Sequence, residues 1–139
     1  MAGRALVRSV LALPGWQVRI GGPNAEKAKK VAGELGCEHA RVDLADANSV
    51  DMFFSESDWV AMACAAKWTE PAAEGALRSN SHWLDLQLSL PNKHRSLERY
   101  SQEFRDKGLC CVTDGGFHPG LPATMVRWAL QQRPGMRCG

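Results

Sequence analysis

The segment Asp114-Gly-Gly-Phe-His-Pro-Gly-Leu-Pro122 separates an apolar run at residues 109–113 from a helix-like run at residues 123–131. Gly115 and Gly116 allow backbone angles that a side chain would forbid, and the two prolines fix φ near the start of the next helix. A strand that ends at glycines and leads into a helix is typical of the ligand-facing edge of an α/β sheet. The segment therefore predicts a shaped connection at such an edge, with an ordinary strand-to-helix link as the alternative.

Helical and strand-like patterns alternate along the rest of the chain. Amphipathic helical spacing occurs at residues 2–13, 24–35, 48–53, 69–77 and 91–107, and short apolar or alternating runs occur at residues 16–20, 38–42, 58–64, 81–86 and 109–113. Asn24 is expected to cap the second helix and Thr69 the fourth, and the third is expected to begin at Asn48 or Ser49. The run at residues 58–64 is apolar along its length, which is typical of a strand covered on both faces. Strict alternation with short connections predicts the α/β class, with a doubly wound and mostly parallel sheet.

The composition is that of one globular domain. The 139 residues are 45% hydrophobic and 23% charged, with a formal net charge of +2, and such values exclude a disordered or fibrous chain. Basic residues are dispersed, and the lysines at 27, 29 and 30 share a helix with Glu26 and Glu34, so the chain has no footprint for nucleic acid. No apolar run reaches the roughly 20 residues of a membrane span and no signal-peptide core is present, so no membrane partner is expected.

The five cysteines are Cys37, Cys64, Cys110, Cys111 and Cys138. They show no CxxC spacing and most lie in apolar runs, which predicts buried, reduced thiols in a cytoplasmic protein. The same packing argues against a thiol nucleophile at residues 110–111. Cysteines and histidines also lack the spacing of metal ligands, so no metal is expected.

Doubly wound sheets begin with a strand, whereas this chain begins with a helical pattern. In the usual strand order 3-2-1-4-5-6, the first strand lies in mid-sheet and is followed by a glycine-rich turn that holds the pyrophosphate of a dinucleotide. Without that strand and loop, Gly3 alone is left of such a turn. The runs at residues 16–20 and 58–64 then either pair directly or keep their facing edges apart, and unpaired edges favour a homo-oligomer.

Five segments, in matching order and spacing, resemble the NAD(P)-binding domain of the saccharopine dehydrogenase family: Gly3-Arg-Ala-Leu-Val7, Trp16-Gln-Val-Arg-Ile-Gly-Gly-Pro-Asn-Ala-Glu-Lys-Ala28, Val42-Asp-Leu-Ala-Asp46, His82-Trp-Leu-Asp-Leu86 and Gly116-Phe-His-Pro-Gly-Leu-Pro122. The resemblance implies a Rossmann-like fold and a nicotinamide-dependent oxidoreductase whose relatives act on amino-acid-derived imines or secondary amines. It also implies that residues 1–132 are a partial dinucleotide-binding domain, clipped at both ends, and that residues 133–139 are a tail. A chain clipped in this way is expected to be weakly active or inactive alone.

The resemblance places the cofactor-binding residues at strand ends and at the start of the first helix. They are Gly3, Arg4, Gly21, Gly22, Asp43, Leu44, Ala63, Cys64, Gly116 and Phe117. No acid for an NAD ribose stands at the end of the first strand, and Arg19 and Lys27 lie near it, which favours NADP slightly over NAD. Both side chains could equally be surface charges. Asp43 could accept a hydrogen bond from the adenine amine or could cap a turn.

Asp85 and His118 are the catalytic candidates. His118 stands where the resembled family has aspartate, and it could move protons near neutral pH or be a plain polar surface group. Asp85 follows Leu84 at a strand end, where it could orient substrate or a cofactor ribose, or cap the following loop. The preferred function is the cofactor domain of a saccharopine dehydrogenase-like oxidoreductase, which binds a dinucleotide and a small-molecule substrate. The alternatives are a non-catalytic dinucleotide-binding or interaction module and an inactive truncated product.

Overall fold

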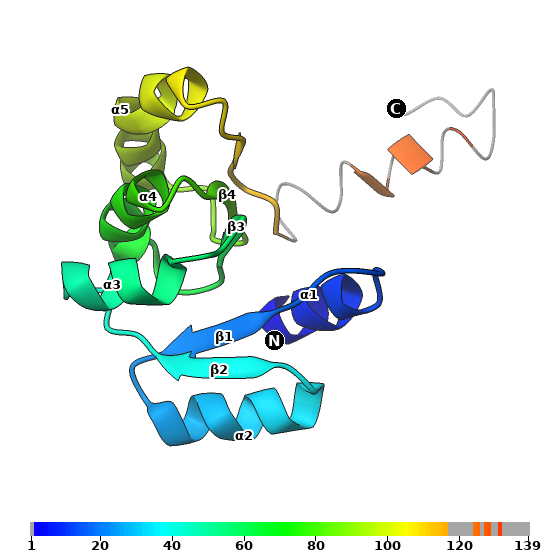
Figure 1. Ribbon diagram of the computed structural model, residues 1–139. Helices are drawn as coiled ribbons and strands as arrows, with labels where there is room; N and C mark the ends of the chain where they lie inside the picture. Colours follow the sequence, from blue (N-terminus) through cyan, green and yellow to red (C-terminus); the bar gives the residue numbers. More distant parts are fainter. Residues whose placement is uncertain (1, 117–123, 126, 129–130, 132–139) are drawn as a thin grey trace.

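Helices and strands alternate along the chain, as the sequence predicts. The computed structural model describes residues 2–116, 124–125, 127–128 and 131. Its elements are α1 (Ala2–Leu11), β1 (Arg19–Gly22), α2 (Ala25–Leu35), β2 (Glu38–Arg41), α3 (Ala47–Phe54), β3 (Trp59–Met62), a 3₁₀ turn η1 (Ala66–Trp68), α4 (Thr69–Arg78), β4 (His82–Asp85), α5 (Pro91–Asp106) and β5 (Cys111–Val112) (Figure 1). Of the helix predicted at residues 123–131, the described members are helical. The predicted tail, residues 133–139, lies outside the described residues.

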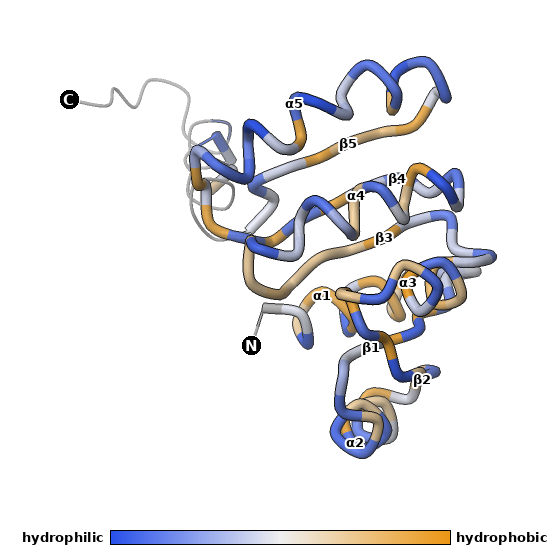
Figure 2. The backbone as a smooth tube through the Cα atoms, turned by 90° about the vertical axis from the view of Figure 1, so that its left-hand side faces the viewer, coloured by the Kyte–Doolittle hydropathy of each residue, from blue (hydrophilic) through white to orange (hydrophobic). Residues whose placement is uncertain are grey.

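All strand pairs are parallel, but the strands form two sheets. One sheet contains β1 and β2, and the other has the order β3-β4-β5. Figure 2 shows the strands in the order β5, β4, β3, β1, β2 from top to bottom. The predicted doubly wound parallel fold is confirmed. Within the described residues no strand joins β1 to β3, so the facing edges stay apart instead of pairing directly.

The hydrophobic core lies between the three-stranded sheet and helices α3, α4 and α5. Its fully buried members include Val50, Ala72, Ala73, Ala76 and Trp83. Burial of a large apolar side chain of this kind contributes about 1.5–3 kcal/mol. The core therefore fixes the position of β3 and β4 firmly from one side of the sheet.

The other face of β3 is less covered than the sequence predicts. Val60 and Met62 are buried, but Trp59 is 37% exposed and Ala61 is exposed as well. The prediction of a strand covered on both faces is therefore wrong. The apolar run fits a strand whose α3–α5 side alone is filled, because neighbouring strand residues point to opposite faces.

Helix starts agree with the sequence in one case and differ in two. Asn24 caps α2, and its side chain accepts a hydrogen bond from the N–H of Lys27 at 2.9 Å. Helix α3 begins at Ala47, just before the expected Asn48 or Ser49, and its cap is Asp46, which accepts from the N–H of Asn48 at 3.0 Å. Thr69 is the first residue of α4 and not its cap, since η1 continues directly into the helix.

The first strand lies further along the chain than predicted. It was expected at residues 16–20, yet it spans Arg19–Gly22 and so includes both glycines. A Cβ atom at Gly21 would lie 2.4 Å from the ring of Phe53 and 2.7 Å from Val42. Position 21 of the strand therefore requires glycine, because Phe53 of α3 and Val42 leave no room for a side chain.

The cysteines are less buried than predicted. Cys64 and Cys110 are exposed, whereas Cys37 and Cys111 are half-buried. All four are free thiols, and Cys138 lies outside the described residues. Cys64 follows β3 and Cys110 precedes β5, so the two exposed cysteines lie just outside the strands.

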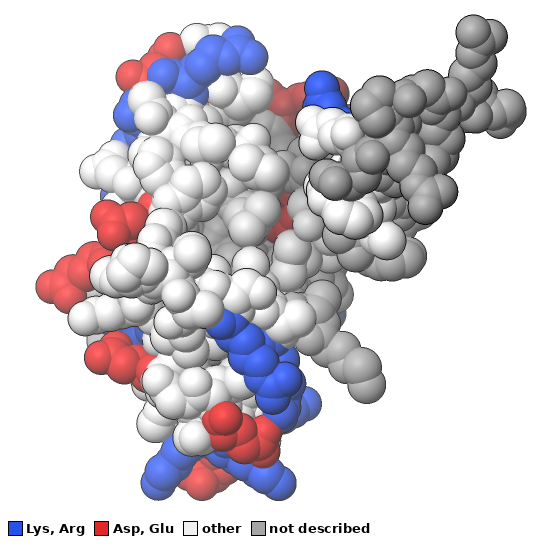
Figure 3. Space-filling model, turned by 90° about the vertical axis from the view of Figure 1, so that its right-hand side faces the viewer, with Lys and Arg blue, Asp and Glu red and all other residues white. Residues whose placement is uncertain are grey.

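The surface carries mixed charges, in line with the dispersed basic residues of the sequence. In Figure 3, basic and acidic side chains lie next to one another over the lower part of the molecule, which holds α2. Across the described residues, every helix is too short or too polar to cross a membrane. The same residues contain no cluster of potential metal ligands.

Candidate functional site

The start of α1 lies against the end of β3. A Cβ atom at Gly3 would lie 3.3 Å from the Cβ atom of Ala63, so glycine allows the first turn of the helix to approach the strand closely. The structure thus brings together two residues predicted for cofactor binding. The next predicted residue, Arg4, forms an exposed ion pair with Glu34 of α2.

The ends of β1 and β2 carry Gly22 and Asp43. The carbonyl of Gly22 accepts a hydrogen bond from the N–H of Val42 at 3.1 Å, which places Asp43 next to the glycine. Asp43 Oδ1 accepts from the N–H of Ala45 at 3.0 Å, which is the turn-capping alternative. A Cβ atom at Gly22 would meet nothing within 4 Å, so the space above this glycine is open.

Two other residues predicted to bind the cofactor, Leu44 and Cys64, make contacts within the protein. Leu44 is half-buried and packs against the hydrophobic core. Cys64 is exposed, and its carbonyl accepts a hydrogen bond from Gln87 Nε2 at 3.2 Å. Their backbones line the edge of the sheet, while the Leu44 side chain points to the core.

The turn after β5 requires its glycines. The N–H of Gly115 donates to the carbonyl of Asp85 at 2.9 Å. A Cβ atom at Gly116 would lie 2.8 Å from the carbonyl oxygen of Leu86, a backbone atom that cannot move aside easily. Residues 114–116, the part of the segment that the structure describes, therefore lie on the end of β4. Phe117 and His118 lie outside the described residues.

Asp85 lies at the end of β4 with its side chain fully buried. Its Oδ1 accepts hydrogen bonds from the N–H groups of Gln87 (3.1 Å) and Asp114 (3.3 Å). Its Oδ2 accepts from Trp83 Nε1 (3.3 Å) and Thr113 Oγ1 (2.7 Å). The structure thus shows the loop-capping alternative, with the carboxylate buried inside this hydrogen-bond network. Contact between this carboxylate and a substrate would require the network to open.

Lys93 is the main partner that the sequence analysis missed. Its ammonium group is fully buried, lies 2.9 Å from Asp85 Oδ1, and also forms an ion pair with Asp114. Lys93 is in the first turn of α5, which begins at Pro91 and has no acid there. A cation at a helix N-terminus is unfavourable to the helix dipole. A lysine in the first turn of a helix without a nearby acid in that turn indicates a partner elsewhere in the chain. This was the feature of the sequence from which the ion pair could have been predicted.

Asp114 has a left-handed backbone, with φ 59°. This conformation costs on the order of 1–3 kcal/mol for a residue other than glycine. Lys93 holds the side chain on one oxygen, and His94 Nε2 lies 2.9 Å from the other. Burial alone would raise the pKa of Asp114, but hydrogen bonds and charge from Lys93, with hydrogen bonds from Ser89 and His94, lower it. The ion pair with Lys93 thus fixes the position of Asp114, the residue before Gly115 and Gly116.

Replacing Asp114 with asparagine is expected to flatten the acid side of the stability profile. Because the folded state lowers the pKa of Asp114, its contribution is complete above the unfolded value, near pH 4, and is lost as pH falls through the folded value. Urea unfolding of the wild type and of Asp114→Asn from pH 7 to pH 2.5 would measure this. Parallel profiles below pH 4 would contradict the expectation.

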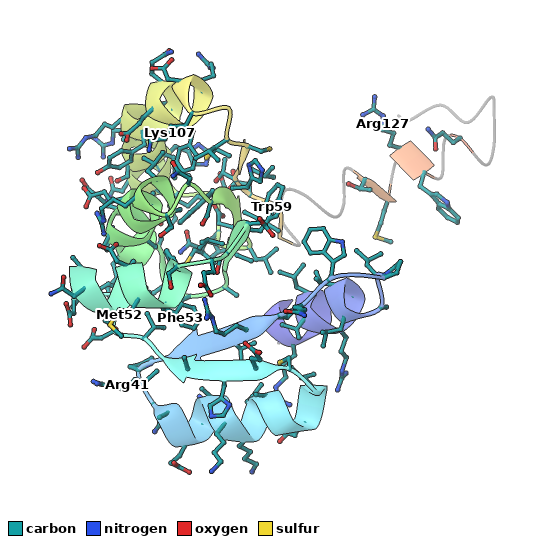
Figure 4. The ribbon with its side chains drawn as sticks, viewed as in Figure 1. Arg41, Met52, Phe53, Trp59, Lys107 and Arg127 are labelled. Carbon is teal, nitrogen blue, oxygen red and sulfur yellow. The ribbon has the colours of Figure 1, made fainter. Side chains whose placement is uncertain are left out.

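The two arginines near β1 have different roles. Arg19 Nη2 donates to the carbonyls of Phe53 (2.7 Å) and Ser55 (2.9 Å) at the end of α3, so its charge is engaged within the protein. Arg41 pairs in register with Gly22, and its Nε donates to the carbonyl of Pro23 at 3.4 Å. Figure 4 shows Arg41 at the end of β2, near Phe53 of α3. Of the two, Arg41 lies beside the glycine end of β1.

Cys111 does not have the properties of a nucleophile. Its side chain is half-buried on β5. Burial, with the charge of Asp85 and the proximity of Cys110, raises the pKa of the Cys111 thiol to about 11. The thiol is therefore protonated at neutral pH, in line with the sequence analysis.

Alternating parallel strands and helices, with glycines at the carboxyl edge, define an α/β domain of the Rossmann-like class. No family model and no curated protein matches the sequence. Among solved structures, the chain is similar to apo histidine-tagged saccharopine dehydrogenase (L-Glu forming) from Saccharomyces cerevisiae, with a TM-score of 0.78 and 15% identity over 93% of this chain and 28% of that chain.

Two reductases share the same fold. An NADPH-dependent quinone oxidoreductase from Escherichia coli has a TM-score of 0.60 and 14% identity, over 94% of this chain and 49% of that one. A Citrobacter sp. triphenylmethane reductase, complexed with NADP(H), has a TM-score of 0.59 and 15% identity, over 80% of this chain and 44% of that one. The chain thus spans less than half the length of each of these three proteins, and at such identities the likeness shows the fold.

Proposed function

We propose that this chain is the NAD(P)-binding domain of a saccharopine dehydrogenase-like oxidoreductase. In such an enzyme, hydride passes to or from an amino-acid-derived imine or secondary amine. The single observation that supports this most strongly is the similarity of fold to saccharopine dehydrogenase over 93% of the chain. The resemblance of the sequence segments to that family is an independent argument for the same function.

The residues at the carboxyl ends of the strands suit the ribose and the nicotinamide of a dinucleotide, and suit its pyrophosphate less well. The open space at Gly22 suits a ribose, and the turn at Gly116 suits the nicotinamide side. The pyrophosphate would rest on the N-terminus of α1, where Gly3 is the last element of a glycine-rich turn. The nicotinamide supplies the hydride, while this chain binds and orients the cofactor. Weak binding is therefore expected for the chain alone.

Arg41 is the best candidate in the described residues for choosing NADP over NAD. It lies beside Gly22 and Pro23, where the ribose 2′-phosphate would lie, whereas Arg19 is engaged at α3. Replacing Arg41 with alanine is expected to weaken NADPH binding at least about tenfold, since a charge-assisted contact is worth about 1.5–3 kcal/mol, and to leave NADH binding unchanged. Fluorescence titration with both cofactors would measure this. Equal losses for both would contradict the assignment.

A second candidate function is a dinucleotide-binding module without catalysis. The complete burial of Asp85 favours it, because this carboxylate is engaged by Lys93, Trp83 and Thr113. The two candidates share cofactor binding and differ in chemistry. They are separated by whether reduced cofactor is consumed when an imine formed from an amino acid and a keto acid is supplied.

Titration of the chain with NADPH and NADH tests cofactor binding, which both candidate functions require. A saturable rise in cofactor fluorescence, weak for both and stronger for NADPH, is the expected result. No binding of either cofactor at millimolar concentration would overturn both candidate functions for this chain.

A further inference from the structure

A groove runs along the outer side of β5. It has a volume of about 360 Å³ and is lined by residues of α5 and β5: His94, Leu97, Glu98, Ser101, Phe104, Arg105, Leu109, Cys111 and Thr113. Figure 2 shows β5 as the outermost strand, next to α5. The groove thus runs along the outermost strand of the sheet, and Gly3 and Gly22 do not line it.

The backbone of β5 offers hydrogen-bonding groups to this groove. The N–H of Trp83 donates to the carbonyl of Cys110 at 2.8 Å, so residues 110 and 112 bond toward β4. Because successive strand residues bond to opposite sides, the groups of Cys111 and Thr113 point away from β4. The N–H of Leu109 is not available to a partner, because it donates to the carbonyl of Phe104 at 2.8 Å. These three residues line the groove. In the described part of the chain, no strand pairs with that side of β5.

The groove has an apolar floor and a charged rim. Leu97 and Phe104 are buried, and Cys111 is half-buried with a neutral thiol at physiological pH. Glu98 and Arg105 stand on the rim, seven residues apart on α5 and both exposed. Neither forms an ion pair within the described residues. The rim therefore presents one negative and one positive group to a partner.

The direction of the rim follows from the connection between α5 and β5. The short link at residues 107–110 makes the helix and the strand run in opposite directions, so Arg105 lies toward Leu109, and His94 and Glu98 lie toward Thr113. Glu98 and Arg105 are about 10 Å apart along the helix axis. Four residues of an extended strand span about 13 Å. Side chains at positions i and i+4 share one face of a strand, and their separation exceeds that of the two charges by about 3 Å, a difference that long charged side chains can span.

We propose that this groove binds an extended segment of another protein, which adds to β5 as an antiparallel edge strand. The segment carries a basic side chain near its start over Glu98, an apolar side chain two residues later over the floor, and an acidic side chain two residues beyond that over Arg105. Antiparallel pairing is slightly stronger than parallel pairing, and doubly wound sheets commonly carry one antiparallel edge strand. Strand addition beside a helix is an established mode of peptide recognition.

The probe is the peptide acetyl-Thr-Lys-Thr-Val-Thr-Glu-Thr-amide, and its control is the same composition with Lys and Glu exchanged. We expect saturable binding of the first peptide, at least fivefold tighter than the second. Hydrogen exchange should slow at the amides of Cys111 and Thr113, whereas the amide of Leu109 is already hydrogen-bonded to Phe104. Equal affinities for the two peptides, or protection at β2 or β3 instead, would overturn the proposal. So would a stable dimer, seen by sedimentation, that buries this edge.

Two sets of variants locate the site. Ser101→Trp fills the groove and should weaken binding at least tenfold, whereas Gln102→Trp, on the neighbouring exposed position of α5, should leave it unchanged. The double variant Glu98→Lys with Arg105→Glu should reverse the preference between the two peptides. This reversal does not depend on how Ser101→Trp folds, and a merely structural effect would not produce it. An unchanged preference would contradict the assignment of the charges.

Discussion

Replacement of Lys93 with methionine is expected to lower the free energy of unfolding by about 3–5 kcal/mol. The side chains of Lys93 and Asp85 are both fully buried, and their charged atoms lie 2.9 Å apart. Methionine fills the same space but leaves Asp85 buried without its counter-charge. The Asp114 side chain loses its ion pair in the same step, and its left-handed backbone loses support. Urea unfolding, followed by circular dichroism, measures the change.

The matched control is Lys30→Met, which removes an exposed lysine from α2 and should change stability by less than about 0.5 kcal/mol. The double variant Lys93→Met with Asp85→Asn should regain part of the loss, because it removes the uncompensated charge. A loss below about 1 kcal/mol for Lys93→Met, or no recovery in the double variant, would show that the buried ion pair does not hold the site together.

The network around Lys93 joins segments that are distant in sequence. Gln87 bonds to the carbonyl of Cys64 after β3 and to Thr69 at the start of α4. Asp85 and Lys93 then connect β4 and α5 to the turn that begins at Asp114. The ends of β3, β4 and β5 are thus fixed to one another at the edge where a cofactor is proposed to bind. A preorganised edge of this kind reduces the ordering that binding must impose.

The sequence predicts the order and type of the elements because each depends on local spacing. Apolar residues at helical intervals face the core in α2 and α4, and Asn24 caps its helix through a partner three residues away. The end of β1 was misplaced since glycine usually ends a strand. Position 21 of this strand requires glycine because Phe53, 32 positions away, occupies the space of a side chain. Contacts at such separation are not visible in local patterns.

Only part of the candidate site could be predicted, because the rest depends on contacts between residues that are distant in sequence. The resemblance names Gly3, Ala63 and Gly116, but the closeness of Gly3 to Ala63 is seen only in the structure. The roles of Lys93 and Arg41 depend on partners brought together by folding, and the sequence shows each only as an isolated charge. His118 and Phe117 remain predictions.

The second large effect is expected at Gly75, in the middle of α4. A Cβ atom there would lie 2.2 Å from Val50 Cγ1 and 3.1 Å from the Phe54 ring, so Gly75→Ala forces α3 and α4 apart. Overpacking of a buried contact costs about 1–3 kcal/mol. Alanine is otherwise the better helix former by about 1 kcal/mol, and the sign of the measured change therefore reports which effect dominates. We expect destabilisation, measured by urea unfolding.

Gly33 in α2 provides the matched comparison. It is also a helical glycine, but a Cβ atom there would meet nothing within 4 Å. Gly33→Ala should therefore stabilise the protein by about 0.5–1 kcal/mol through helix propensity alone. The same chemical change is thus expected to have opposite signs in α2 and α4, because α4 packs against α3 while this face of α2 meets solvent. Stabilisation by both substitutions would mean that α3 and α4 are not held as closely as their contact at Gly75 indicates.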